Sequence, residues 1–278
     1  MSQERIDHTA TMLPNGKVLV TGGFHNLNAR GTTELYDPLI ETWLYNPRLT
    51  YVRKLHTATL LTNRKVLIAG GNDDFSFPNA SELYDPLKGT WAVSGNMKQP
   101  RLWHTASLLK NGKVLVASGH RRGNSLLTAE LYDPETGNWT TTGNMSYARG
   151  KHTASVLRNG QVLVTGGHNG TYYLKSAELY DPETGNWTST GKMNYGRLKH
   201  ASVVLKNGKV LVTGGYGYRP DKKVRLFNRT EIYDPETESW TNTSDLNSIL
   251  GTHTAFLLTD GKVLAVGGKY SEILNTAE

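Results

Sequence analysis

Arginine and histidine recur together along the chain, and both residue types could bind an anion. An Arg-x-x-His motif occurs five times, with its Arg at Arg5, Arg53, Arg101, Arg149 and Arg197. A guanidinium group pairs with carboxylates and phosphates through two parallel hydrogen bonds, so several of them at one mouth could cradle an anion. A residue that recurs in every repeat is more simply explained by a structural role than by anion binding, because it recurs with the fold. We therefore expect each Arg to tie a loop to neighbouring carbonyls, and each repeated His to be a hydrogen-bonded packing element.

Two further histidines, His120 and His168, occupy equivalent places in adjacent repeats, and His25 lies one place later in the first repeat. A metal site there would need converging carboxylates, and Asp73 and Asp74 are the near candidates. No His-x-x-x-His or Cys-x-x-Cys spacing supports such a site, so we predict no metal. The chain has no Cys, which excludes disulfides and thiol chemistry but leaves the compartment open.

These residues belong to a repeat with a period of 48 residues. Its copies begin at His8, His56, His104, His152, His200 and His253, and only the last interval is longer, at 53 residues. A copy continues with a run like Gly-Lys-Val-Leu-Val-x-Gly-Gly, then Glu-Leu-Tyr-Asp-Pro, then a Trp. Short runs rich in Val, Leu, Thr and Tyr, bounded by Gly, Asn, Asp and Pro, predict strands joined by turns. Each full copy is therefore predicted to be a four-stranded antiparallel sheet whose second strand is buried on both faces.

A Gly doublet, a Tyr and a Trp in this order and at this period resemble the kelch repeat, whose units are the blades of a β-propeller. The resemblance covers essentially the whole chain, with departures at Ser118 in one doublet and at Leu250 in place of a sixth Arg. It implies an all-β, kelch-type β-propeller with five complete four-stranded antiparallel blades and a partial sixth. The repeat units are expected at about 5–52, 53–100, 101–148, 149–196, 197–249 and 250–278 of a single domain, 1–278. The last copy stops where its third strand begins, so either the chain is a fragment of a longer chain or the ring closes with a half blade. We expect the fragment, since an exposed strand edge invites pairing.

Candidate binding residues gather in the loops where the copies stop agreeing. In an antiparallel four-stranded blade, the loop from strand two to strand three and the loop into the next blade emerge on the same face. Most Tyr and Phe residues that the repeat does not require lie in these loops, together with many Arg and Lys. Tyr, Trp and Arg dominate binding hot spots. The predicted ligand-binding residues are Trp103, His120, Arg121, His168, Tyr172, Tyr216, Tyr218, Arg219 and Tyr270.

The charge balance indicates an anionic partner. The chain carries 31 Lys and Arg against 24 Asp and Glu, a formal net charge of +7. We therefore predict a non-catalytic recognition scaffold that binds an anionic peptide, protein or glycan on the loop face of the propeller. No cofactor, nucleic acid or membrane partner is expected. The open edge of the last blade could also pair with a second chain, since an unpaired strand edge invites pairing.

The alternative is a sugar-active enzyme of the kelch type, a glycan isomerase or hydrolase. It would use loop carboxylates such as Asp73, Asp74 or Glu272 as acid or base beside a Tyr at the central mouth. The radical-copper oxidases that contain kelch-type propellers need a Tyr cross-linked to Cys, and sialidase propellers carry Ser-x-Asp-x-Gly-x-x-Trp boxes. This chain has neither. We therefore predict no catalytic residues, and the geometry of the carboxylates separates the two functions.

Overall fold

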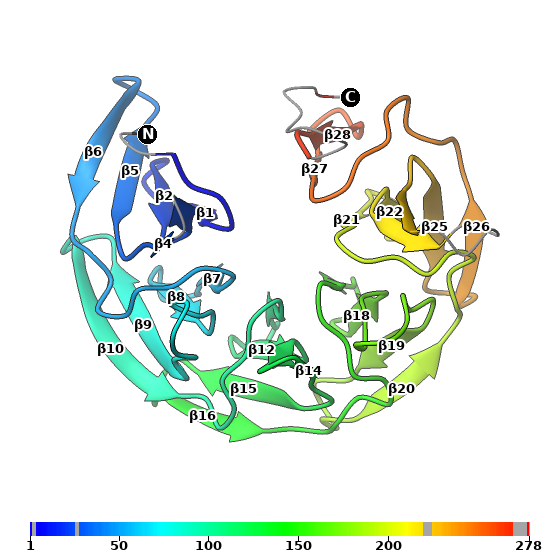
Figure 1. Ribbon diagram of the computed structural model, residues 1–278, viewed down its shortest axis with the longest axis horizontal. Helices are drawn as coiled ribbons and strands as arrows, with labels where there is room; N and C mark the ends of the chain where they lie inside the picture. Colours follow the sequence, from blue (N-terminus) through cyan, green and yellow to red (C-terminus); the bar gives the residue numbers. More distant parts are fainter. Residues whose placement is uncertain (2–3, 26–27, 219–223, 269–276, 278) are drawn as a thin grey trace. The chain divides into compact units, whose positions relative to one another are not determined.

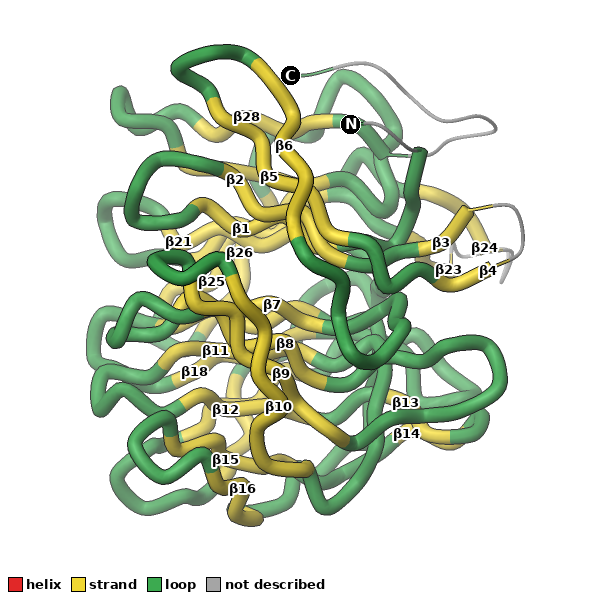
Figure 2. The backbone as a smooth tube through the Cα atoms, turned by 90° about the vertical axis from the view of Figure 1, so that its left-hand side faces the viewer, coloured by secondary structure: helices red, strands yellow, loops and turns green. Residues whose placement is uncertain are grey.

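The computed structural model describes residues 1, 4–25, 28–218, 224–268 and 277. Regular structure in this part of the chain is all β-strand, drawn in yellow between green loops and turns in Figure 2. No helix among the described residues is long and apolar enough to cross a membrane. The predicted repetition of four-stranded antiparallel sheets, here called blades, is confirmed.

The first three blades each place their strands side by side in chain order, as the blue strands of blade one show in Figure 1. Blade one contains β1 (Thr9–Met12), β2 (Val18–Thr21), β5 (Thr33–Asp37) and β6 (Thr42–Asn46). Blade two contains β7 (Thr57–Leu60), β8 (Val66–Ala69), β9 (Ala80–Asp85) and β10 (Thr90–Asn96). Blade three contains β11 (Thr105–Leu108), β12 (Val114–Ala117), β15 (Ala129–Asp133) and β16 (Asn138–Thr141).

The later blades repeat this order, and the sixth has two strands. Blade four contains β17 (Thr153–Val156), β18 (Val162–Thr165), β19 (Ala177–Tyr180) and β20 (Trp187–Thr190). Blade five contains β21 (Ala201–Val204), β22 (Val210–Thr213), β25 (Thr230–Asp234) and β26 (Ser239–Asn242). Blade six contains β27 (Thr254–Leu257) and β28 (Val263–Val266). Val266 also bridges to Ala277, in the register that pairs Ala117 with Ala129, so Ala277 stands where the repeat predicts the third strand to begin.

Each blade has two distinct ends. The turn end carries the tight turns between strands one and two and between strands three and four. The loop end carries the loops from strand two to strand three (22–32, 70–79, 118–128, 166–176 and 214–229) and the linking loops into the next blade. Short strands that the sequence did not predict lie at the loop end: β3 (Phe24–His25), β4 (Asn28–Ala29), β13 (His120–Arg121), β14 (Asn124–Ser125), β23 (Tyr216–Tyr218) and β24 (Val224–Leu226). β3 pairs with β4 and β23 with β24, forming small hairpins beyond the blade edge (Figure 2).

The chain forms two compact units. Unit 1 comprises Met1–Arg122 and Ala129–Thr142, and unit 2 comprises Gly123–Thr128 and Gly143–Glu278. Within unit 1 the first strands β1, β7 and β11 neighbour one another, and within unit 2 so do β17, β21 and β27. The organisation as a single domain, expected from the sequence, stays a prediction.

The second strand of each blade forms the centre of the core. β8, β12 and β18 are buried along their whole length, which confirms the prediction from their continuous apolar runs. In unit 1, Leu67 and Val116 pack in one cluster with Tyr132, and in unit 2, Leu163 packs with Val210. Since apolar burial is the main driving force for folding, these contacts hold neighbouring blades together within each unit.

The repeated Tyr and Trp pack as a pair in every complete blade. Their ring centroids lie 4.9 to 5.2 Å apart in a tilted arrangement. The Trp residues differ in burial, however: Trp139 is 5% exposed, whereas Trp43 is 37% exposed. Trp139 Nε1 donates to Ser81 Oγ of the preceding blade at 3.2 Å. The packing role of the repeated Trp therefore depends on the neighbouring blade.

Candidate functional site

The repeated arginines are structural, and they hold the loop end in place. The side chains of Arg53, Arg101, Arg149 and Arg197 are fully buried. Arg197 donates to Glu231 at 2.6 Å and to the carbonyl oxygens of Gly214 and Arg229, both at 2.8 Å. The other four Arg make the same ion pair, at 2.6 to 3.0 Å. The prediction that they tie loops to carbonyls is confirmed, and their guanidinium groups do not form the anion cradle considered above.

The Glu of each buried pair also fixes the linking loop that precedes its blade. Glu231 accepts the backbone N–H groups of Asn194 at 2.6 Å and of Tyr195 at 3.3 Å. The equivalent Glu residues of blades two, three and four accept the corresponding two N–H groups. Hydrogen bonds to a buried carboxylate are charge-assisted and strong. The linking loops are therefore fixed before a ligand arrives, which lowers the entropic cost of binding.

The repeated histidines are packing elements, as predicted. His104 Nε2 lies 2.9 Å from Thr57 Oγ1 of the preceding blade, and His253 Nε2 lies 2.7 Å from Thr213 Oγ1. Burial lowers the pKa of His104 to about 3, with the charge of Arg101 as a further cause. Burial also lowers the pKa of His253 to about 4. These imidazoles are neutral at physiological pH and join one blade to the next.

The residue immediately before each repeated His has a left-handed backbone and varies from blade to blade. These display positions are Asp7, Leu55 and Trp103 in unit 1 and Lys151, Lys199 and Thr252 in unit 2, with φ between 51° and 63°. This conformation costs a non-glycine residue about 1 to 2 kcal/mol. Lys199 N donates to Lys151 O at 2.9 Å, and Thr252 N donates to Lys199 O at 2.9 Å. Successive display positions within a unit are therefore neighbours, each presenting a different side chain from the same backbone.

In unit 2, the display positions place positive charge beside an imidazole. Burial is the main cause that lowers the pKa of His168, and the charge of Lys151 lowers it further. His168 Nδ1 accepts the backbone N–H of Gly170 at 3.1 Å, which assigns the proton of the neutral ring to Nε2. Leu198, which precedes Lys199, bridges to Tyr216 of the β23 hairpin. Two lysines thus lie at the base of the loops that carry the aromatic side chains.

The rings of His168, Tyr173 and Tyr218 form a row at the loop end of unit 2. The rings of His168 and Tyr173 lie 5.2 Å apart, and those of Tyr173 and Tyr218 lie 4.6 Å apart, edge to face. Burial, and then the neighbouring Tyr218, raise the pKa of Tyr173. Tyr218 is 42% exposed and ends the row. The structure therefore brings together two predicted residues, His168 and Tyr218, through one that was not in the predicted set.

Tyr172 stands at the tip of a tight loop next to this row. Asn169 Oδ1 accepts the backbone N–H of Thr171 at 3.0 Å and of Tyr172 at 2.7 Å, a turn that the Asn side chain stabilises. The Tyr172 side chain is 64% exposed. Its backbone is fixed while its ring is free, which suits a residue that packs on a ligand.

Tyr216 is more deeply placed than its neighbours in sequence. Its ring and the side chain of Leu226 leave no room for a Cβ at Gly251, so both pack on the backbone of the next linking loop. Phe227 is buried behind the hairpin, 6.0 Å from the ring of Tyr195. Tyr216 therefore holds the β23 hairpin against the blade and offers less surface to a ligand than Tyr218.

Unit 1 has a different loop end. The Trp103 side chain, at its display position, meets His120 edge to face with ring centroids 5.5 Å apart. His120 is 8% exposed, and Leu102 pairs with it along the backbone. Arg121 follows at the edge of the blade and is exposed. The structure thus brings Trp103, His120 and Arg121 together within unit 1.

The carboxylates of the enzyme alternative are occupied in the loop structure of unit 1. Asp73 accepts the backbone N–H groups of Phe75 at 3.0 Å and of Ser76 at 2.5 Å. Burial acts to raise the pKa of Asp73, but the hydrogen bonds from Ser76 outweigh it and lower the pKa. Asp74 pairs with Lys54 and accepts the N–H of Ala29 at 2.8 Å. Both carboxylates therefore stabilise the loops of unit 1.

Several predicted residues lie outside the described part of the chain, namely Arg219, Tyr270 and Glu272. Sequence reasoning also missed Lys151 and Lys199. The signal was present, since the position before each His varies within an otherwise constant Arg-x-x-His motif. Among the residues that the structure describes, no group of three or more His, Cys, Asp or Glu is arranged to hold a metal ion.

A comparison with known families identifies a kelch-repeat domain. Residues 55–268 match the model of the KLHDC2/KLHL20/DRC7 Kelch-repeats domain. The match extends from the residue before His56 to the Gly doublet of blade six. No curated protein matches the chain.

Proposed function

Since the chain belongs to the KLHDC2/KLHL20/DRC7 Kelch-repeats family, we propose that it is a non-catalytic recognition scaffold whose unit 2 binds an acidic segment of a partner protein. The observation that carries this proposal is the position of Lys151 and Lys199. They occupy neighbouring display positions below the row of His168, Tyr173 and Tyr218.

The charge of these loops favours an acidic ligand. The segments 143–152, 168–176, 191–200, 216–218 and 224–229 contain Lys and Arg but no Asp or Glu. The linking loop into blade six carries one carboxylate, Asp245, and Asp221 lies outside the described residues. An anion that enters this surface meets no like charge from these segments, while Lys151, Lys199 and Arg225 attract it. Opposite charges across an interface raise both the rate of encounter and the selectivity for the partner.

The exposed tyrosines favour a peptide. Tyr172 and Tyr218 offer large, rigid surfaces with a hydroxyl at the edge, and such residues lose little entropy when they are buried. The linking loops beneath them are already held by the buried Arg–Glu pairs. A short acidic segment would thus lie along the tyrosines with its carboxylates toward the lysines.

Fluorescence anisotropy tests this proposal with a labelled decapeptide of alternating Glu and Ser as the probe. The double variant Lys151→Gln/Lys199→Gln should bind about tenfold more weakly, because each lost charge pair contributes up to about 1 kcal/mol. Raised salt should weaken the wild type more than this variant. The matched control is Lys206→Gln/Lys209→Gln, which removes two charges at the turn end of blade five.

Three outcomes contradict the proposal. In the first, the control lowers affinity as much as the loop-end variant, which means that net charge alone drives binding. In the second, the matched peptide of Gln and Ser binds equally well. In the third, a heparin-derived oligosaccharide binds through Lys151 and Lys199 while the acidic peptide does not, which assigns the surface to glycans.

A further inference from the structure

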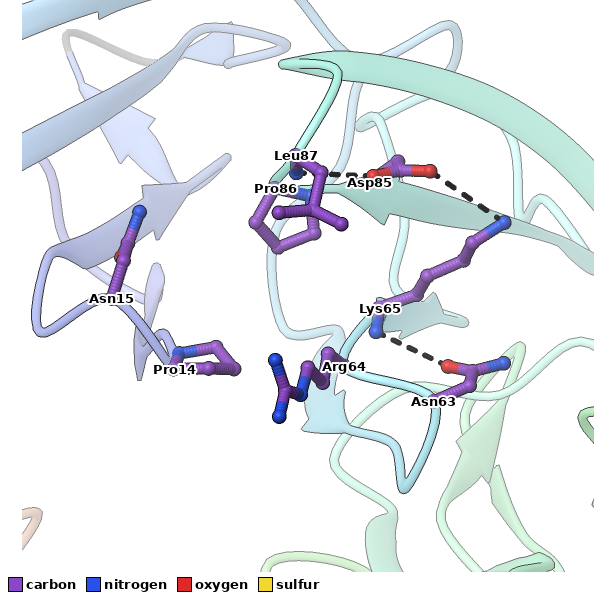
Figure 3. Close-up of a pocket in the computed structure, with 8 residues that line it drawn as sticks. All are labelled: Pro14, Asn15, Asn63, Arg64, Lys65, Asp85, Pro86 and Leu87. Carbon is purple, nitrogen blue, oxygen red and sulfur yellow. Dashed lines mark hydrogen bonds and ion pairs between the residues drawn. The ribbon is translucent and has the colours of Figure 1, made fainter.

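A second, smaller surface lies at the turn end of unit 1, between the turns of blades one and two (Figure 3). The pocket has a volume of about 210 Å³. It is lined by Pro14, Asn15, Asn63, Arg64, Lys65, Asp85, Pro86 and Leu87. None of these residues belongs to the loop end, so the pocket is independent of the function proposed above.

Arg64 adopts a backbone conformation that the other blades reserve for Gly. The turn between strands one and two has a Gly with positive φ at Gly16, Gly112, Gly160, Gly208 and Gly261. In blade two this position is Arg64, with φ 67°, and its N–H still donates to Leu61 O at 3.0 Å. The turn therefore has the same hydrogen bond as in the other blades. The Arg64 side chain requires a strained backbone, because a residue with a Cβ disfavours positive φ. Strain of this kind concentrates at functional sites.

Two further departures from the repeat face the same pocket. Leu87 stands where blades three, four and five have Glu, although blade one also has a Leu there, Leu39. The side chain of Leu87 is 90% exposed. Pro14 stands where blades three, four and five have Lys or Arg. In Figure 3, Pro86 and Leu87 lie on one side of the opening, and the guanidinium of Arg64 extends toward Pro14. Three changes away from the repeat thus build one apolar pocket with a cation at its mouth.

The charges at the pocket leave one cation available. Lys65 pairs with Asp85 at 3.7 Å, the same turn-end pair that Lys17, Lys113 and Lys209 make in other blades. Asp85 also accepts the N–H of Leu87 at 3.0 Å. The guanidinium of Arg64 is exposed and makes no ion pair with any residue that the structure describes. The guanidinium of Arg64 could therefore pair with an anionic group of a ligand.

We propose that this pocket anchors a segment of a partner protein in which an aliphatic or aromatic side chain lies next to an Asp or Glu. The apolar side chain enters between Pro14, Pro86 and Leu87, and the carboxylate pairs with Arg64. The size of the cavity supports this occupant. At about 210 Å³ it is smaller than the roughly 300 to 1,000 Å³ typical of sites for drug-sized molecules, and it suits a single anchoring side chain.

A random dodecapeptide library displayed on phage tests the proposal, with selection on the wild-type chain and counter-selection on the double variant Arg64→Gly/Leu87→Glu. Both substitutions restore residues that other blades carry, so the variant keeps the fold. Selected peptides should contain an Asp or Glu within a few residues of Leu, Ile or Phe. Their synthetic forms should bind each single variant about tenfold more weakly than the wild type, as expected for the loss of an anchor.

Matched controls separate the pocket from its surroundings. Lys88→Gln removes a neighbouring charge outside the pocket, and Leu39→Glu makes the same change as Leu87→Glu at the equivalent turn of blade one; both should leave affinity unchanged. The melting temperature of Arg64→Gly should equal or exceed that of the wild type, because Gly relieves the positive φ. The proposal is overturned if no peptide is enriched on the wild type over the double variant. It is equally overturned if the acidic and apolar residues of the peptides can be replaced by Gln and Ala without loss, or if either control weakens binding as much as the pocket variants.

Discussion

The loop ends of units 1 and 2 share one scaffold and differ in what it presents. In both, buried Arg–Glu pairs fix linking loops, and the residue before each repeated His has a left-handed backbone. Unit 1 presents Asp7, Leu55 and Trp103 at these display positions, whereas unit 2 presents Lys151, Lys199 and Thr252. The constant residues thus set the geometry of the loop end, and one residue per blade varies on that geometry.

Charge pairing strengthens the difference. In unit 1, Lys54 pairs with Asp74 and lies 4.0 Å above the ring of Phe24, so its charge is used within the loops. In the described parts of the loops from strand two to strand three of blades four and five, the segments 168–176 and 224–229 contain no Asp or Glu. If unit 2 binds an acidic segment as proposed, Asp73 and Asp74 make unit 1 the less favourable surface for that segment.

The largest expected effect tests the shared scaffold. Arg53→Ala in unit 1 and Arg197→Ala in unit 2 should each lower the free energy of unfolding by about 3 to 5 kcal/mol, because each leaves a buried Glu unpaired. Chemical denaturation followed by tryptophan fluorescence measures both. A marked inequality between the two variants would show that the two loop ends are not built alike. Replacing both partners, as in Arg197→Met/Glu231→Leu, should recover part of the loss.

The next prediction compares two tryptophans of unit 1. Trp139→Ala should cost about 3 to 5 kcal/mol, as large-to-small changes in a core do, and it also removes the hydrogen bond to Ser81. Trp43→Ala should cost clearly less, because Trp43 is 37% exposed and Trp139 only 5%. Equal losses in the free energy of unfolding would mean that burial does not determine how much each Trp contributes to stability.

Most of the fold could be predicted from the sequence, because the same pattern of strand and turn residues recurs in each copy of the repeat. Strand order, the burial of strand two and the structural roles of Arg101 and His104 all follow from residues that recur at a fixed spacing. The small hairpins β3–β4 and β23–β24 could not be predicted, since each occurs in a loop with its own sequence and has too few residues for a periodic pattern.

The candidate site was predicted less well, and the reason is physical. Counting aromatics by loop identified Tyr172 and Tyr218 but could not show that Tyr216 packs on Gly251. Lys151 and Lys199 became candidates because both have a left-handed backbone, and a Lys in the sequence does not indicate that conformation. Such a conformation is imposed by the surrounding hydrogen bonds and becomes visible only in three dimensions.

The pH dependence of stability gives a smaller test in each unit. The pKa of His104 is lowered from 6.5 to about 3 and that of His253 from 6.5 to about 4. A depressed folded-state pKa means that the unfolded state binds the proton first, so stability is full above pH 6.5 and falls as the pH decreases. Each His should remove about 1.4 kcal/mol per pH unit, down to about pH 4 for His253 and about pH 3 for His104. His253→Gln should flatten this slope in denaturation curves between pH 6 and 4, and an unchanged slope would show that His253 is not buried as neutral imidazole.

The smallest expected effect compares the two loop tips. Phe75 and Tyr172 both follow a side chain that caps the loop, Asp73 in unit 1 and Asn169 in unit 2, and both are exposed, at 96% and 64%. Because exposed tips bury little surface, neither Phe75→Ala nor Tyr172→Ala should change the free energy of unfolding by more than about 0.5 kcal/mol.

Binding of the acidic decapeptide should separate the two tips. Tyr172→Ala should weaken it by about 1 kcal/mol, roughly fivefold in Kd, because the ring packs on the peptide beside cationic loops. Phe75→Ala should leave it unchanged, since the carboxylates of Asp73 and Asp74 repel an acidic chain from that tip. If anisotropy titrations instead show a loss for Phe75→Ala and none for Tyr172→Ala, recognition belongs to unit 1, and exposed aromatic surface outweighs local charge in selecting the partner.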